Sequence, residues 1–204
     1  FPFGRKTIKI STLLKSSAFA VAALSMVGVA APASAQDGKA ITTVVKISGI
    51  PWFDRMETGV NKFAEQNPEM DIRQVGPATA DSAQQLQIVQ DLVATGVDAL
   101  AVVPMDPDIL EGILGRAMDR GTIIVTHEAD NQANTHADIE AFDNADYGAA
   151  LNERLAQCMG GEGKWTTFVG SLGSRTHMQW VGAGEENAKK YPGMELVDPN
   201  NESF

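Results

Sequence analysis

The tetrapeptide His127-Glu128-Ala129-Asp130 places one imidazole and two carboxylates within four consecutive residues. It follows the apolar run Thr122-Ile123-Ile124-Val125, which has the length and composition of a buried strand. These side chains could accept hydrogen bonds from hydroxyl groups, bind a metal ion, or act as an acid–base pair. The tetrapeptide alone leaves all three kinds of chemistry open.

The rest of the chain disfavours a metal site and catalysis. Its three histidines form no HxxxH or HxH pair, and Cys158 is its only cysteine, so neither a metal nor a cofactor is expected. It also lacks a GxSxG motif, a P-loop and a GxGxxG turn after a strand; Gly182-Ala183-Gly184 lies inside a helical pattern. The sequence therefore favours hydroxyl recognition and predicts no catalytic residue.

Two aromatic residues follow Pro51, in the turn after the first predicted strand. Trp52 and Phe53 could stack on the apolar faces of a sugar ring, while polar neighbours orient its hydroxyls. Alternatively, both residues simply begin a helix and pack on the sheet. Phe53 continues the helical stripe of Met56 and Val60, whereas Trp52 lies outside that stripe. Trp52 is therefore the stronger candidate.

Lys46 is a single cation near the end of that same apolar strand. Burying a lysine is costly unless it is paired, and Glu128 or Asp130 could supply a carboxylate from another strand end. The alternative is that Lys46 lies at an exposed strand end.

Later in the chain, the loop from Gly170 to Ser174 precedes a helical pattern. It could bind an anion at the helix start, but it lacks the P-loop lysine, and an ordinary strand–helix turn is favoured. Arg175 and His177 follow this loop, where we expect donors to ligand hydroxyls.

The elements that position these residues alternate between strands and helices. Residues 99–103 and 122–125 are apolar runs that flank an amphipathic helix over 109–118, which predicts a β-α-β unit with buried parallel strands. In such sheets the ligand crevice lies beyond the carboxyl ends of the strands. The same alternation continues, with strands predicted at 41–47, 70–75, 137–142, 164–169 and 194–197, and helices at 52–67, 81–95, 147–159 and 176–190. The fold class is a doubly wound, Rossmann-like α/β fold with a parallel sheet.

The formal net charge of −10 is unevenly distributed. Residues 1–35 contain four basic residues and no acid, which leaves 12 basic against 26 acidic residues in the remainder. An acidic body repels phosphate backbones and anionic lipid, so nucleic-acid binding is not expected.

The amino-terminal segment has the order of a secretory signal. Basic residues up to Lys15 precede an uncharged segment from Ser16 to Ala31, which is followed by Pro32-Ala33-Ser34-Ala35. This order predicts cleavage after Ala35. A retained membrane anchor is the alternative, but the apolar part is interrupted and short for a bilayer span.

We therefore expect three parts: a signal peptide over residues 1–35, a complete lobe over 36–136, and the start of a second, incomplete lobe over 137–204.

In order and spacing, these motifs make the chain similar to type I periplasmic binding proteins of the ribose and autoinducer-2 branch. The segments that carry the resemblance span nearly all of residues 40–200; they are VVKISGIPWF, QLQIVQDLVATGVDALAVVP, GRAMDRGTIIVTHEAD, the Asp143-Asn144 pair and VGSLGSRTHMQW. The resemblance implies two Rossmann-like lobes joined by a hinge, which close around a small polar ligand and deliver it to an ABC permease in the inner membrane.

The resemblance also implies roles for individual residues. Trp52 and Phe53 match the family's ring-contacting aromatics, and Glu128 and Asp130 match the acidic hydroxyl acceptors of the first lobe. Asn144 lies near the crossing between the lobes.

Two cations complete the implied site. Arg175 matches a hydroxyl-contacting arginine of ribose-binding relatives, and Lys46 matches a ligand-contacting lysine of autoinducer-2 receptors. Those receptors have an Asp-Gln pair where this chain has Thr176-His177. This departure argues against autoinducer-2 as the ligand, and a pentose, a deoxyhexose and an inositol-like ligand are equally good alternatives.

The resulting expectation is an exported, monomeric, periplasmic substrate-binding protein for a sugar or polyol, and not an enzyme. Three alternatives share the fold: a LacI-type repressor, a periplasmic sensing subunit of a receptor kinase, and an exported α/β enzyme. A repressor would carry a helix-turn-helix where this chain has an export signal.

Overall fold

The computed structural model describes residues 38–197 and 202–203. The predicted export signal lies outside the described residues. Within those ranges, none of the helices combines the length and the apolar character needed to cross a membrane.

Five strands of the chain form one parallel sheet with the order β2-β1-β3-β4-β5. Its strands are β1 (Ala40–Val44), β2 (Asp71–Val75), β3 (Ala99–Val102), β4 (Ile123–His127) and β5 (Ala137–Ile139). Val44 pairs with Val102, which pairs with Thr126, so the carboxyl ends of β1, β3 and β4 lie side by side. The predicted parallel α/β sheet is confirmed, and β2 forms one edge of it.

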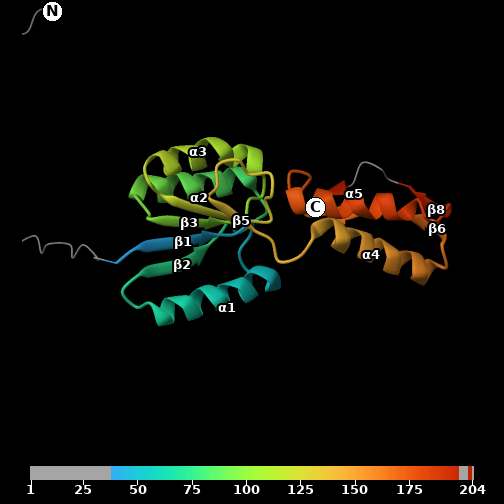
Figure 1. The fold of residues 1–204 in the computed structure, drawn as a ribbon, viewed down its shortest axis with the longest axis horizontal. Helices are drawn as coiled ribbons and strands as arrows, with labels where there is room; N and C mark the ends of the chain where they lie inside the picture. The colour runs from blue at the N-terminus through green and yellow to red at the C-terminus, as the bar shows by residue number, and fades with distance from the viewer. Residues whose placement is uncertain (1–37, 198–201, 204) are drawn as a thin grey trace, which may run out of the picture. The chain divides into compact units, whose positions relative to one another are not determined.

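Three helices cover this sheet: α1 (Pro51–Gln66), α2 (Ser82–Thr95) and α3 (Pro107–Asp119). Helices α2 and α3 lie on one face and α1 on the other (Figure 1). The ends of α2 follow from its sequence. The Asp81 carboxylate accepts hydrogen bonds from the N–H groups of Ala83 and Gln84, and Gly96, with a φ of 82°, ends the helix in the left-handed conformation.

The main core lies between the sheet and the α2–α3 layer. Its fully buried side chains come from alternate strand positions and from the inner helix faces, and they include Val44, Val89, Leu100, Leu114 and Ile124. Burial of one such side chain stabilises the fold by about 1.5–3 kcal/mol.

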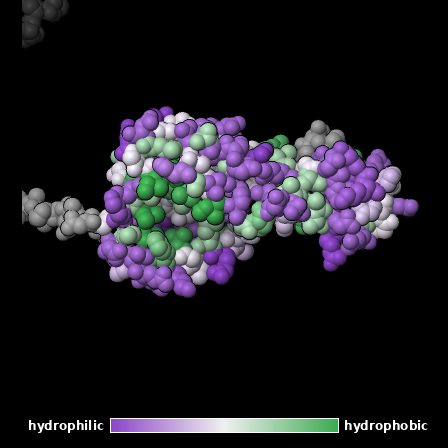
Figure 2. Space-filling model, viewed as in Figure 1, coloured by the Kyte–Doolittle hydropathy of each residue, from purple (hydrophilic) through white to green (hydrophobic). Residues whose placement is uncertain are grey.

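The opposite face of the sheet is less completely covered among the described residues. Because strand side chains alternate, Ile123 and Val125 point away from the core that contains Ile124. Ile123 is 54% exposed and Ile139, on β5, is 61% exposed. Figure 2 shows hydrophobic side chains gathered in a hollow between α1 and the α2–α3 layer.

The second part of the chain continues the alternation. It contains α4 (Asn144–Met159), β6 (Glu162–Trp165), β7 (Phe168–Val169), α5 (Arg175–Ala188), β8 (Gly193–Leu196) and β9 (Glu202–Ser203). The single strand predicted over 164–169 is wrong in one respect, because it is interrupted at Thr166 and Thr167. Its two pieces pair with different partners, β6 with β8 and β7 with β9.

Helices α4 and α5 pack closely because Gly148 has no side chain. A Cβ atom at Gly148 would lie 2.3 Å from the carbonyl oxygen of Trp180 on α5. Further along, the buried Asn187 side chain donates a hydrogen bond of 3.1 Å to Asn152.

Replacing Gly148 by alanine is expected to destabilise the fold by about 1–3 kcal/mol, because the opposing atom belongs to the backbone and cannot rotate away. The matched control is Gly182→Ala on α5, where an added Cβ meets nothing within 4 Å. There the better helix propensity of alanine should raise stability by up to about 1 kcal/mol. Urea unfolding of both variants measures the difference, and a change of the same sign in both would contradict this account of the packing.

Candidate functional site

The buried side chain of Gln85 holds together the strand ends that carry the site. Its amide nitrogen donates to the carbonyl oxygens of Val45 (3.1 Å) and Val103 (2.8 Å). Its amide oxygen accepts from the backbone N–H of Met105 at 2.7 Å. These three bonds satisfy backbone groups that no neighbouring strand reaches, and they fix the chain next to Lys46.

Lys46 and Glu128 form a buried ion pair at this edge of the sheet. Lys46 Nζ lies 2.7 Å from Glu128 Oε2, and the two residues are only 4% and 6% exposed. The prediction that a buried Lys46 takes a carboxylate partner from another strand end is confirmed.

The backbone of Glu128 is unusual. Its φ of 59° makes it the one non-glycine residue with a left-handed backbone among those the structure describes. Such a conformation costs about 1–3 kcal/mol and persists where the surroundings fix it. Here the hydrogen bonds from Lys46 and Thr176 to the carboxylate hold it in place.

The start of α5 completes the environment of the ion pair. Lys46 Nζ donates to Ser174 Oγ at 2.8 Å and to Thr176 Oγ1 at 3.4 Å, and Thr176 Oγ1 donates to Glu128 Oε2 at 3.3 Å. Ser174 occupies the N-cap position of α5, yet its side chain makes no capping bond. Its hydroxyl is instead directed to Lys46.

Burial and pairing shift the pKa values of Lys46 and Glu128 in opposite directions. Burial lowers the pKa of Lys46, and the neighbouring Glu128 only partly opposes that effect. Burial by itself would raise the pKa of Glu128, but the charge and hydrogen bond of Lys46 outweigh it, so the pKa of this carboxyl is lowered. Glu128 is therefore ionised at neutral pH.

A cavity of about 470 Å³ opens beside the ion pair. This volume falls within the usual range for small-molecule sites. Its polar side is formed by Lys46, Glu128 and His177. The other residues that line it are mostly apolar or aromatic, namely Ile47, Ile50, Trp52, Phe53, Ala80, Met105, Phe142, Tyr147, Gly170 and Trp180. We call this cavity the cleft.

Three aromatic rings of the cleft contact one another. Tyr147 lies 4.9 Å from Phe142 and 5.1 Å from Trp180, measured between ring centroids. Neither Phe142 nor Tyr147 nor Trp180 was expected as a site residue. They come from the segment before α4 and from α4 and α5, and no single-sequence pattern predicts how those two helices pair.

His177 faces the cleft next to Trp180, with 5.3 Å between the ring centroids. Burial lowers the pKa of His177, and the nearby Lys46 charge lowers it further. Its buried Nδ1 has no hydrogen-bond partner within the part of the chain that the structure describes. The imidazole at this wall of the cleft is therefore neutral at neutral pH, and its Nδ1 is a buried polar atom without a partner among the described residues.

Of the nine residues that the sequence singled out, the structure brings five to the cleft: Lys46, Trp52, Phe53, Glu128 and His177. Trp52 is 49% exposed, whereas Phe53 is 3% exposed and also packs against Val45 and Val103. Phe53 therefore begins the helix and packs on the sheet, and it also lines the cleft.

Asp130 and Arg175 lie outside the cleft lining and pair with each other. Arg175 Nε donates to Asp130 Oδ1 at 2.7 Å, and Gln179 Nε2 donates to Asp130 Oδ2 at 2.6 Å. The hydrogen bond from Arg175 lowers the pKa of Asp130. These two residues were expected on opposite sides of a ligand, and here they join the end of β4 to α5 directly.

Asn144 and His127 are also placed away from the cleft lining. Asn144 accepts a hydrogen bond of 2.7 Å from Trp180 Nε1 and so orients a ring that lines the cleft. His127 lies on the same strand face as Ile123 and Val125, because strand side chains alternate. It lines a separate cavity of about 280 Å³, and its Nδ1 lies 2.5 Å from the carbonyl oxygen of Ile139.

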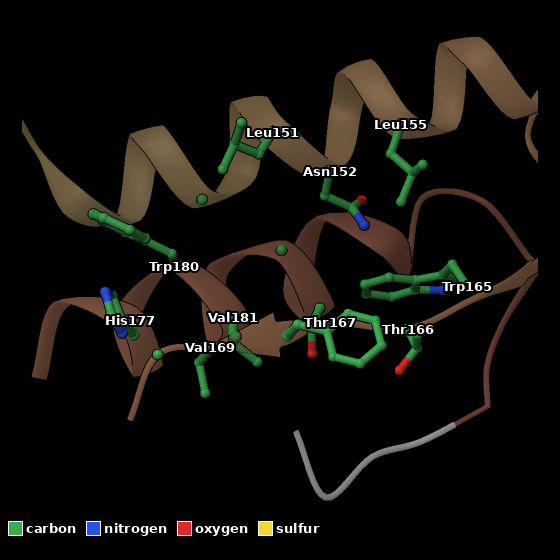
Figure 3. Close-up of a pocket in the computed structure, with 14 residues that line it drawn as sticks. Leu151, Asn152, Leu155, Trp165, Thr166, Thr167, Val169, His177, Trp180 and Val181 are labelled. Carbon is green, nitrogen blue, oxygen red and sulfur yellow. The ribbon is translucent and has the colours of Figure 1, made fainter. Parts of the chain in front are cut away.

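A third cavity, of about 270 Å³, lies between α4, α5 and the strand pieces β6 and β7 (Figure 3). Leu151 and Leu155 of α4 and Trp165 and Val181 contribute apolar walls. His177 and Trp180 line both this cavity and the cleft. Across residues 38–197, no cluster of three or more histidine, cysteine, aspartate or glutamate side chains is arranged to hold a metal ion.

Known proteins share this architecture. In Bacillus subtilis, the ribose import binding protein is 26% identical over 169 residues, which are 81% of this chain and 55% of the relative. The chain thus spans about half the length of that relative.

Two solved structures have the same fold. A solute-binding protein of an ABC transporter from Burkholderia graminis, in complex with D-arabinose, has a TM-score of 0.69 at 24% identity, over 78% of this chain and 54% of that one. Another, from Agrobacterium vitis with bound D-fucose, has a TM-score of 0.73 at 23% identity, over 79% of this chain and 57% of that one.

Residues 41–203 match the sequence profile of a family described as the periplasmic binding protein domain. The match covers both strand–helix parts and every residue that lines the cleft. The chain therefore belongs to the periplasmic binding protein domain family.

Proposed function

We propose that this chain captures an uncharged sugar or sugar-like polyol in the periplasm and delivers it to an ABC permease in the inner membrane. The observation that carries the proposal is the cleft, in which a buried ion pair lies at one side of an aromatic-walled cavity of about 470 Å³. A sugar ring has apolar faces that stack on aromatic walls and hydroxyls that need fixed polar partners.

The arrangement of charges supports a binding role. Lys46 and Glu128 are hydrogen-bonded to each other, so neither stands as an independent acid or base towards the cleft. Sugar binding by the relatives agrees with this, since the Bacillus protein is named for ribose import and the two solved structures hold D-arabinose and D-fucose.

Capture is proposed to occur by closure of two lobes. In this proposal the first lobe contains the five-stranded sheet with α1, α2 and α3, and the second begins at α4. The boundary therefore lies after β5 (Ala137–Ile139), which pairs with β4, and not at residue 136 as the sequence suggested. Lys46, Trp52, Phe53 and Glu128 would contact the ligand from the first lobe, and His177 from the second. Asp130 and Arg175 would stabilise the closed arrangement through their mutual ion pair. Contacts made only in the closed state would supply the free energy of closure.

A thermal-shift series with D-ribose, D-arabinose, D-fucose, D-galactose, L-rhamnose and myo-inositol tests the proposal. A ligand present at 100 times its Kd should stabilise the purified protein by about 2.7 kcal/mol. Recovery of the sugar unchanged after incubation should accompany the shift. Conversion of the bound sugar would favour an exported enzyme instead, and the absence of any shift across the series would contradict sugar capture.

A further inference from the structure

The polar groups of the cleft are few, and most of them are already engaged. The Lys46 ammonium has three N–H donors, and it makes hydrogen bonds to Glu128, Ser174 and Thr176. The indole N–H of Trp180 donates to Asn144. The remaining polar side-chain groups of the cleft belong to Glu128, His177 and Tyr147.

The rest of the cleft wall is apolar or aromatic. Trp52 and Phe142 keep 49% and 38% of their surface exposed, and both line the cleft. Met105 and Ile50 add aliphatic wall. A ligand hydroxyl placed against these walls would lose its water without gaining a partner, which is unfavourable.

The charges of the cleft also cancel. The ammonium of Lys46 and the carboxylate of Glu128 neutralise each other at 2.7 Å. A charged ligand would leave its own charge without a counter-ion in an apolar cavity. The described cleft therefore favours an uncharged ligand over a sugar phosphate or a uronic acid.

From these contacts we infer that the cleft selects an uncharged 6-deoxyhexose over the hexose that differs from it only by a C6 hydroxyl. The inference rests on the proposed function and names the substrate class of that same site. The ring hydroxyls would face Glu128 and His177, and the C6 methyl group would lie against the aromatic and aliphatic walls.

Two matched sugar pairs test this directly: D-fucose with D-galactose, and L-rhamnose with L-mannose. Calorimetric titration of the wild-type protein should give a Kd at least about tenfold lower for the deoxy member of each pair that binds, which is the usual effect of one group in an apolar pocket. Equal or tighter binding of the hexose would overturn the inference and leave sugar capture intact. Failure of all four sugars and of D-ribose to bind would instead contradict the proposed function.

Variants of the wall locate the origin of the preference. Met105→Gln adds an amide that can form a hydrogen bond with a C6 hydroxyl. The ratio of the Kd of the hexose to the Kd of its 6-deoxy counterpart should therefore fall towards one. Because Met105 is buried, Phe142→Gln at an exposed wall position provides a second variant that folding tolerates more readily. Met118→Gln, which changes the same residue type on α3 outside the cleft, should keep the wild-type ratio. A ratio that stays at the wild-type value in both wall variants would refute the assignment of the methyl group to these walls.

Discussion

Replacing Lys46 by methionine is expected to lower the free energy of unfolding by about 3–5 kcal/mol, because it leaves the Glu128 carboxylate buried without its counter-ion. Sugar binding should be lost as well, since the carboxylate no longer has a fixed position. Urea unfolding monitored by tryptophan fluorescence measures the first effect, and calorimetry measures the second.

The exposed ion pair between Lys39 and Asp98 provides the control. It has the same 2.7 Å separation between nitrogen and oxygen, but its side chains are 69% and 37% exposed. Lys39→Met should therefore change stability by no more than about 1 kcal/mol. Similar losses in both variants would show that burial of the Lys46–Glu128 pair is not what makes it important.

Near the pKa of Glu128, the free energy of unfolding should change with pH in opposite directions in the wild type and in Lys46→Met. In the wild type, pairing lowers the pKa of Glu128 below its ordinary value of 4.5, so its contribution to stability is present above that value and is lost as the pH falls through the lowered pKa. In the variant, burial acts without the lysine and raises this pKa. The variant should then lose stability as the pH rises above 4.5, and the two curves should diverge there.

The largest loss of affinity without loss of stability is expected for Trp52→Ala. Trp52 is 49% exposed at the edge of the cleft, so truncation removes an aromatic wall and leaves the core intact. We expect at least about a tenfold increase in the sugar Kd, equal to about 1.4 kcal/mol of binding free energy.

Phe63→Ala is the matched control for this variant. Phe63 lies on the same helix, is 47% exposed and does not line the cleft. Its replacement should leave the Kd unchanged. An unchanged Kd for Trp52→Ala, with calorimetry sensitive enough to detect a threefold difference, would remove Trp52 from the site.

The sequence predicted those features that depend on local pattern. Apolar runs and helical stripes predicted the parallel α/β fold, because strand and helix periods differ. The costly burial of a lysine predicted that Lys46 would need a carboxylate partner, and Glu128 fills that role. Strand alternation also explains why His127 points to the α1 face, although the cluster of polar residues after β4 suggested otherwise.

What the sequence did not predict depends on contacts between distant segments. The contact of Phe142 and Tyr147 with Trp180 requires α4 and α5 to pack at Gly148, where a backbone carbonyl fills the space of a side chain. The pairing of Asp130 with Arg175 likewise depends on where α5 begins. Gln85 lies within the helix predicted over 81–95 and no pattern singled it out, yet its amide joins two strand ends.

The position of Ser174 has a consequence for how easily the site could rearrange. The Ser174 hydroxyl oxygen accepts a hydrogen bond from Lys46 at 2.8 Å. Because Ser174 is the N-cap residue of α5, the same oxygen could instead accept from a backbone N–H in the first turn of that helix. If the lysine withdraws when a sugar enters or leaves, the oxygen is released to the helix, and the lost bond is partly replaced. Such an exchange of donors would keep the two arrangements close in energy, so the site could change between them without a large energetic cost.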